Sequence, residues 1–162
     1  MSDFYTEQLV KRKNPSSTMM LKVLLILATV FSVLLIFVVP LAIIAPLVLV
    51  CVDVFAFQSM DVEYEYLFVN GNLDVDKIMS KSRRKNVFAM DMNELEVLAP
   101  KGAPELRQYQ GLKATNLSSL TENAKLYEMI VVQKGTKKKV IFEPNPTILE
   151  GMKLLAPRKV FL

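Results

Sequence analysis

The sequence predicts a protein of two parts, an N-terminal transmembrane helical hairpin at residues 19–57 and a soluble β domain at residues 58–162. Three observations predict this class. A long apolar run carries no charge, short segments of alternating polarity follow it, and an amphipathic stripe lies near the C-terminus. The β domain is expected to be a barrel or sandwich that ends in an α-helix.

The apolar run extends from Val23 to Val52, and these 30 consecutive residues carry no charge. About 20 helical residues at 1.5 Å each cross a hydrocarbon core of about 30 Å. A core helix of a soluble protein would show a polar face at helical spacing, and this run shows none. The apolar core of a signal peptide is only about 7–15 residues long. The run therefore predicts a retained anchor in the cell membrane.

Two arrangements of the apolar region are open. Its 39 residues, 19–57, are too many for one helix in an average bilayer and enough for two short ones. Pro40 and Pro46 lie near its middle, where proline would break a helix or permit a tight turn. We expect a hairpin of two spans, 19–39 and 41–57. A single long, tilted or kinked helix is the alternative, which would make the protein single-pass.

Basic residues before the apolar region predict its orientation. By the positive-inside tendency they mark the N-terminal flank as cytoplasmic. After the region the nearest basic residue is Lys77, which is too distant to orient the second flank. A hairpin would place both termini in the cytoplasm, whereas a single span would place them on opposite sides. The basic residues of the first flank are Lys11, Arg12, Lys13 and Lys22.

Residues 1–18 are expected to form a cytoplasmic tail. Within it, residues 3–13, DFYTEQLVKRK, are predicted to form a short interfacial helix or a frayed end, because a helix of this length is marginal by itself. Four apolar side chains would give such a helix its membrane contact. They are Phe4, Tyr5, Leu9 and Val10.

The β domain begins with alternating residues. From Val62 to Phe68 apolar side chains fall on one face and acidic side chains on the other. Asn70-Gly71 follows, a strong hairpin signal because both central positions of such a turn need positive φ. A two-residue loop would place Phe68 opposite Leu73, so the apolar faces agree in register.

The rest of the domain continues this pattern and ends in a helix. Gly135-Thr136 is expected to turn the last two strands into a second hairpin, and a short helical piece is expected from Pro104. The C-terminal helix is predicted at 146–156, because Asn145 can cap it and an apolar stripe follows at helical spacing. The five further predicted strands are Val87–Met92, Glu94–Leu98, Gly111–Leu117, Leu126–Lys134 and Lys138–Glu143. The helix stripe is Ile148, Leu149, Met152 and Leu155.

Seven short strands followed by an amphipathic helix are the order expected of a pleckstrin-homology-like barrel. The stretch Tyr64–Pro100, YEYLFVNGNLDVDKIMSKSRRKNVFAMDMNELEVLAP, resembles an uncharacterised family of small bacterial membrane proteins. More distantly it is similar to bacterial pleckstrin-homology-like domains attached to transmembrane hairpins. The similarity runs from the Lys11–Lys13 cluster to the terminal helix. It implies a membrane-anchored cytoplasmic β domain and supplies no activity and no site residues.

The residue types argue against catalysis. The chain has no histidine, and its one cysteine, Cys51, lies in the apolar run, which excludes zinc-type sites. No glycine-rich phosphate loop is present, and no cofactor is expected. Ser82 and Lys85 have the spacing of a serine–lysine pair, but that spacing joins side chains on a helix, and these residues are expected between strands. We predict that the protein is not an enzyme.

An acidic patch is expected on the outer face of the first hairpin. The predicted register places Glu65 opposite Asp76, and opposed like charges are unfavourable. A hard cation or a basic partner would relieve the repulsion, as would Arg83-Arg84-Lys85 folding back; the alternative is a solvated face. The patch comprises Glu63, Glu65, Asp74 and Asp76.

Two basic clusters are candidate contacts for anionic lipid headgroups or for a membrane protein partner. Near an anionic surface each basic residue contributes about 1 kcal/mol. Ordinary solubilising loop charge is the alternative. Neither cluster is interleaved with aromatic residues and the chain has no tryptophan, so nucleic acid binding is not expected. The clusters are Arg83, Arg84 and Lys85, and Lys137, Lys138 and Lys139.

These observations leave two functional hypotheses of different kinds. The first is a membrane-anchored binding module for a protein partner or for an anionic lipid surface. The alternative is a structural accessory subunit, whose transmembrane segment packs against a larger membrane complex.

Overall fold

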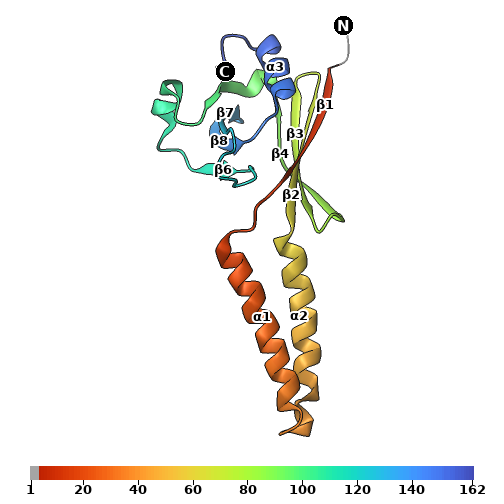
Figure 1. The fold of residues 1–162 in the computed structure, drawn as a ribbon. Helices are drawn as coiled ribbons and strands as arrows, with labels where there is room; N and C mark the ends of the chain where they lie inside the picture. The colour runs from red at the N-terminus through yellow and green to blue at the C-terminus, as the bar shows by residue number, and fades with distance from the viewer. Residues whose placement is uncertain (1–3) are drawn as a thin grey trace. The chain divides into compact units, whose positions relative to one another are not determined.

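The computed structural model describes residues 4–162, apart from the side chain of Pro40. The chain forms two compact units, shown in Figure 1. A helical unit comprises residues 13–62 and 79–83, and a β unit comprises the described residues up to 12 together with 63–78 and 84–162. Each unit is described by itself.

The helical unit is a hairpin of two helices, as predicted. Helix α1 is Ser16–Leu35 and helix α2 is Ile44–Met60, joined through the short 3₁₀ helix η1, Pro40–Ile43. The chain turns at the two prolines because Pro40 starts η1 and Pro46 lies in the first turn of α2, where a missing N–H breaks no helical hydrogen bond.

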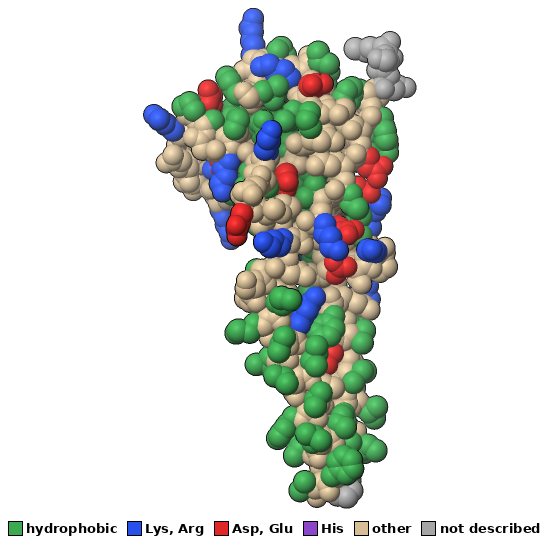
Figure 2. Space-filling view, viewed as in Figure 1, with side chains coloured by type: hydrophobic (Ala, Val, Ile, Leu, Met, Phe, Trp, Pro, Cys, Tyr) green, Lys and Arg blue, Asp and Glu red, His purple; other side chains and the backbone are tan. Residues whose placement is uncertain are grey.

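Both helices are long and apolar enough to cross a membrane. The two candidate spans are Ser16–Leu35 and Leu41–Met60, and only 6% of each is buried within the structure. Figure 2 shows hydrophobic side chains along the face of these helices that it presents. A helix in the core of a soluble domain would be mostly buried, whereas most residues of these two helices are exposed.

The few polar residues of the hairpin face each other. The Thr29 hydroxyl donates to Asp53 Oδ2 at 2.7 Å, and the Ser32 hydroxyl donates to the carbonyl oxygen of Thr29 at 2.7 Å. Ser32 and Asp53 are both buried. The spacing of residues in the apolar run indicated no polar face. The structure nevertheless brings these polar side chains together in a narrow seam between two apolar helices. Small and hydroxyl side chains at such a seam are typical of helix packing in membranes.

The β unit contains two four-stranded sheets. The first, sheet A, is ordered β1-β2-β3-β4, and its β2–β3 turn has φ of 48° at Asn70 and 92° at Gly71, which confirms the predicted hairpin turn. Strand β2 is buried on both faces over most of its length. The strands are β1 Tyr5–Lys11, β2 Val62–Val69, β3 Asn72–Met79 and β4 Arg83–Asp91.

Strand β1 corrects one prediction. It pairs antiparallel with β2, from Tyr5 opposite Val69 to Lys11 opposite Glu63. The interfacial helix expected within residues 3–13 was therefore wrong over β1, and the first residue of that range lies outside the described residues. The seven residues of β1 alternate in burial with a period of two, and β2 supplies backbone partners that a local pattern cannot reveal.

The second sheet, sheet B, is ordered β5-β7-β8-β6 and leaves the sandwich open rather than closed into a barrel. Strands β7 and β8 form the predicted hairpin, but Gln133 pairs with Thr136, so the turn is Lys134-Gly135 and not Gly135-Thr136. The short helical piece expected from Pro104 is the 3₁₀ helix η3, Pro104–Tyr109. The strands are β5 Leu95–Pro100, β6 Ala114–Asn116, β7 Tyr127–Gln133 and β8 Thr136–Phe142.

The two sheets share a core that the C-terminal helix completes. Tyr66 of β2 and Phe142 of β8 meet edge to face with ring centroids 5.8 Å apart, and the Tyr66 hydroxyl donates to the Leu117 carbonyl oxygen at 2.7 Å. Helix α3 is Pro146–Leu155, and the Asn145 side chain caps it as predicted. Leu155 departs from the predicted stripe because it is 52% exposed.

Candidate functional site

The acidic patch of the first hairpin is neutralised from within the sheet. Arg84 Nη1 lies 2.9 Å from Glu65 Oε2, and Arg84 Nε lies 4.0 Å from Asp76 Oδ2. The predicted fold-back of the basic cluster thus occurs through Arg84. Glu63 and Glu65 are each 8% exposed, so the alternative of a solvated face does not hold for them. Within the described residues no group of acidic side chains is arranged to hold a metal ion.

Burial shapes the ionisation of this patch. Burial of Glu65 is the main cause that raises the pKa of its carboxyl, and a hydrogen bond with Glu7 adds to it. The Arg84 guanidinium acts in the opposite direction. The Glu65–Arg84 ion pair therefore joins β2 to β4 within sheet A.

The second basic cluster is engaged inside sheet B. Lys139 Nζ lies 2.7 Å from Glu128 Oε2, and both side chains are buried. Lys137 Nζ lies 2.7 Å from Glu96 Oε1. Lys138 Nζ donates to Gln133 Oε1 at 2.9 Å. Each of the three ammonium groups has a partner on its own sheet, so these contacts give no support to the lipid contact predicted for the cluster.

The Glu96–Lys137 contact predicts a pH dependence of stability. The hydrogen bond from Lys137, and then that from Tyr109, holds the pKa of Glu96 below its ordinary value of 4.5. Because the folded state favours the carboxylate, this contact contributes stability above pH 4.5 and loses it as the pH falls through the lowered pKa of the folded state. We expect Glu96→Gln to flatten the fall in stability below pH 4.5.

The measurement is chemical denaturation of the full chain in neutral detergent over that pH range. Glu150→Gln is the matched control, because Glu150 is exposed on α3. If the stability of the wild type and of Glu96→Gln falls equally with decreasing pH, the Glu96–Lys137 contact is not the source of the pH dependence.

Sheet A gathers basic residues at one of its ends, here named the basic end. Because the strands are antiparallel, β1 and β3 finish where β2 and β4 begin. Within the β unit, the strands and the residues next to them carry five basic side chains at this end. They are Lys11, Arg12, Lys77, Arg84 and Lys85.

Some residues of the basic end are bound and others are open. Arg12 Nη1 donates to the Tyr64 hydroxyl oxygen at 2.7 Å, and Arg84 binds Glu65 as described above. Arg83 and Lys85 are exposed and make no ion pair within the described part of the chain. The sequence pattern had placed the cluster in a connection, whereas the structure places it at the start of β4.

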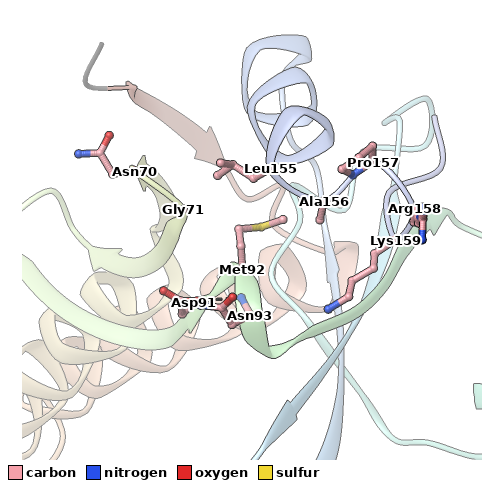
Figure 3. Close-up of a pocket in the computed structure, with 10 residues that line it drawn as sticks. All are labelled: Asn70, Gly71, Asp91, Met92, Asn93, Leu155, Ala156, Pro157, Arg158 and Lys159. Atoms are coloured by element: carbon pink, nitrogen blue, oxygen red, sulfur yellow. Dashed lines mark hydrogen bonds between the residues drawn. The ribbon is translucent and has the colours of Figure 1, made fainter. Parts of the chain in front are cut away.

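A groove of about 430 Å³ lies at the opposite end of sheet A, shown in Figure 3. The Asn70-Gly71 turn, Asp91–Asn93 and the segment after α3 line it. The Asp91 side chain accepts from the Asn93 N–H at 2.7 Å, and Lys159 Nζ donates to the Leu95 carbonyl oxygen at 2.7 Å. The lining includes one carboxylate, Asp91, and one amine, Lys159, and both side chains make hydrogen bonds within the protein. Its mixed lining suits a binding surface.

Comparison with known proteins agrees with this fold. The family model described as a bacterial PH-like domain, DUF6106, matches residues 2–162. Searches of curated proteins and of solved structures gave no match. Two apolar helices, two β-sheets and a C-terminal helix agree with the fold class that the order of predicted elements indicated. The chain belongs to the bacterial PH-like domain family DUF6106.

Proposed function

We propose that this protein is a membrane-anchored binding module. Helices α1 and α2 cross the membrane as a hairpin, both termini lie in the cytoplasm, and the PH-like domain is held beside the inner membrane surface. Its basic end contacts anionic lipid, and the groove of Figure 3 is left open to a protein partner.

The pairing of β1 with β2 carries this proposal. Lys11, five residues before the start of α1, lies opposite Glu63, three residues after the end of α2. Chain segments that pair as neighbouring strands must lie on the same side of a membrane, because a hydrogen-bonded sheet does not cross the bilayer as an open edge. This pairing supports two spans over the single long span that the sequence left open.

Charge supports the cytoplasmic side. The positive-inside tendency counts lysine and arginine close to the ends of spanning helices. Lys11, Arg12 and Lys13 precede α1, and the β3–β4 turn returns Lys81 and Arg83 to the helical unit. The second flank, which had little orienting power in the sequence, therefore gains basic residues through the fold.

The polar seam between the helices bears on the accessory-subunit alternative. A helix that packs against a larger membrane complex is expected to present small or polar residues outward. Thr29, Ser32 and Asp53 instead meet within the hairpin. The outward faces carry mostly large apolar side chains, which suits contact with lipid.

Fusions at both ends test the topology. We expect a fluorescent protein that folds only in the cytoplasm to be active at the N-terminus and after Leu162. A reporter enzyme that folds only outside the cytoplasm is expected to be inactive at both positions and active within the α1–α2 connection. Activity of that reporter enzyme when it is fused after Leu162 would contradict the proposed topology.

A disulfide cross-link tests the pairing of β1 with β2, on which the two-span topology depends. Glu7 and Leu67 are direct partners in the β1–β2 ladder. Opposed β carbons lie about 4.5–5.5 Å apart, near disulfide geometry. Glu7→Cys with Leu67→Cys, in a Cys51→Ala background, is expected to cross-link in oxidised membranes, whereas either cysteine alone is not.

A further inference from the structure

The turn between β3 and β4 packs with the helices rather than with the sheet. Its residues, 79–83, belong to the helical unit. The backbone N–H of Ser80 donates to the carbonyl oxygen of Asp61, the residue that follows α2, at 2.9 Å. Ser80 and Lys81 both have positive φ, 50° and 56°, as the two central positions of a tight turn require. The turn is thus fixed against the C-terminal end of α2.

A small cavity of about 60 Å³ lies between this turn and α2. Gln58 and Ser59 line it from the last turn of α2, and Ser80, Ser82 and Arg83 line it from the turn. A cavity holds a water molecule with about 10–15 Å³ of this volume, so this one has room for a few water-sized groups. A phosphate with its oxygens is a group of this size.

The lining of this cavity offers hydrogen-bond donors that are not used elsewhere. The guanidinium of Arg83, the amide of Gln58 and the hydroxyl of Ser82 have no partner among the described residues. None of the lining residues is acidic. Arginine presents a planar fork of donors that matches phosphate oxygens, and charge-assisted hydrogen bonds of this kind are the strong ones. Phe55 and Met79 complete the lining, and the three donors suit the oxygens of a phosphate.

Helix α2 places this cavity at a particular depth if it spans the membrane. Leu41–Met60 is a candidate span of 20 residues, about 30 Å at 1.5 Å per residue, which equals the hydrocarbon thickness. Gln58 and Ser59 then lie at the boundary with the headgroups. Lys22 supports this depth in the membrane. Its Nζ lies 5.8 Å from the centre of the Phe57 ring, beside the last turn of α2, and a lysine at the end of a span can extend its ammonium group towards the headgroups.

We infer that this cavity binds the phosphate of an anionic phospholipid headgroup, with Arg83 as its charged ligand and Ser82 and Gln58 as neutral donors. This inference rests on the proposed membrane topology and adds to it a specific lipid site. The site holds the β3–β4 turn to the membrane surface, whereas the remaining exposed basic residues act only through their charge.

The test uses the full chain in a neutral detergent, titrated with phosphatidylglycerol and with phosphatidylcholine. We expect preferential binding of phosphatidylglycerol and a loss of about tenfold in affinity, equal to about 1.4 kcal/mol, for Arg83→Gln, because the variant loses a charge-assisted hydrogen bond. Ser82→Ala and Gln58→Ala are each expected to weaken binding about two- to fivefold, since a neutral hydrogen bond contributes less than a charge-assisted one. Arg107→Gln, the same change at an exposed arginine of η3, is the matched control and should leave binding unchanged.

Each other outcome overturns the site in a distinguishable way. Equal losses for Arg83→Gln and Arg107→Gln would indicate diffuse charge attraction. Equal binding of the two lipids would remove the anionic selectivity. Inorganic phosphate is titrated in the same way. If phosphate binds and Arg83→Gln weakens its binding, while phosphatidylglycerol does not bind, the cavity is a site for free phosphate and not for lipid. The terminal fusions report separately on topology, so the lipid site can fail while the proposed function stands.

Discussion

Replacement of Glu128 by glutamine is expected to destabilise the β unit by about 3–5 kcal/mol, because it leaves a buried ammonium group without its counter-charge. Lys139 Nζ lies 2.7 Å from Glu128 Oε2, and the two side chains are only 10% and 8% exposed. Glu128 pairs with Ile141 on β8, so Lys139 is its diagonal neighbour on the same face of the sheet. Little water can reach either charge after the substitution.

Chemical denaturation of the full chain, followed by circular dichroism in neutral detergent, measures the effect. Lys138→Gln is the control, because Lys138 is exposed one residue away and a surface change of this kind is worth about 0.5 kcal/mol or less. Replacing both partners with leucine separates packing from charge, since a well-packed apolar pair is often neutral or stabilising. A Glu128→Gln variant as stable as Lys138→Gln would show that the ion pair does not hold sheet B.

The second large effect is expected at Phe68, where alanine should cost about 3–5 kcal/mol of folding stability. Phe68 is fully buried, and its ring meets that of Phe4 edge to face at 5.7 Å. A β carbon placed at Gly151 of α3 would lie 2.9 Å from the Phe68 ring. Phe68 therefore joins β2, the segment before β1 and the C-terminal helix, and its removal leaves a cavity among all three.

The same denaturation experiment applies, with Phe161→Ala as the matched control. Phe161 is 38% exposed, so the same chemical change should cost far less there. Gly151→Ala provides an independent check, because its added methyl group would lie 2.6 Å from the Phe4 ring and overpacking of this kind costs about 1–3 kcal/mol. Similar stabilities for Phe68→Ala and Phe161→Ala would contradict the assigned contact.

Local chemistry accounts for the elements that were predicted well. The Asn70-Gly71 turn was predicted because few residues tolerate the positive φ values that both positions adopt. The C-terminal helix was predicted because Asn145 caps it and Pro146 begins it, and both preferences depend on neighbouring residues alone. The helical hairpin was predicted because membrane crossing depends on the length and composition of a single segment.

Long-range pairing accounts for what was missed. Strand β1 has no apolar alternation strong enough to mark it, and its partner β2 lies more than 50 residues away in the sequence. The groove of Figure 3 is lined by three segments that only the fold brings together. The engagement of Lys139 by Glu128 likewise depends on the register of β7 and β8, which the sequence did not specify.

The sequence by itself determined that the chain carries an apolar region able to cross a membrane and a β domain with a C-terminal helix, because composition, periodicity and turn residues act over a few neighbouring positions. Only the tertiary structure decided that residues before α1 pair with residues after α2, which favours two spans over one. It also decided which basic residues are held by carboxylates and which stay open, as Arg84 and Arg83 show. The availability of a charge depends on what lies within a few ångströms of it, and those neighbours come from distant parts of the chain.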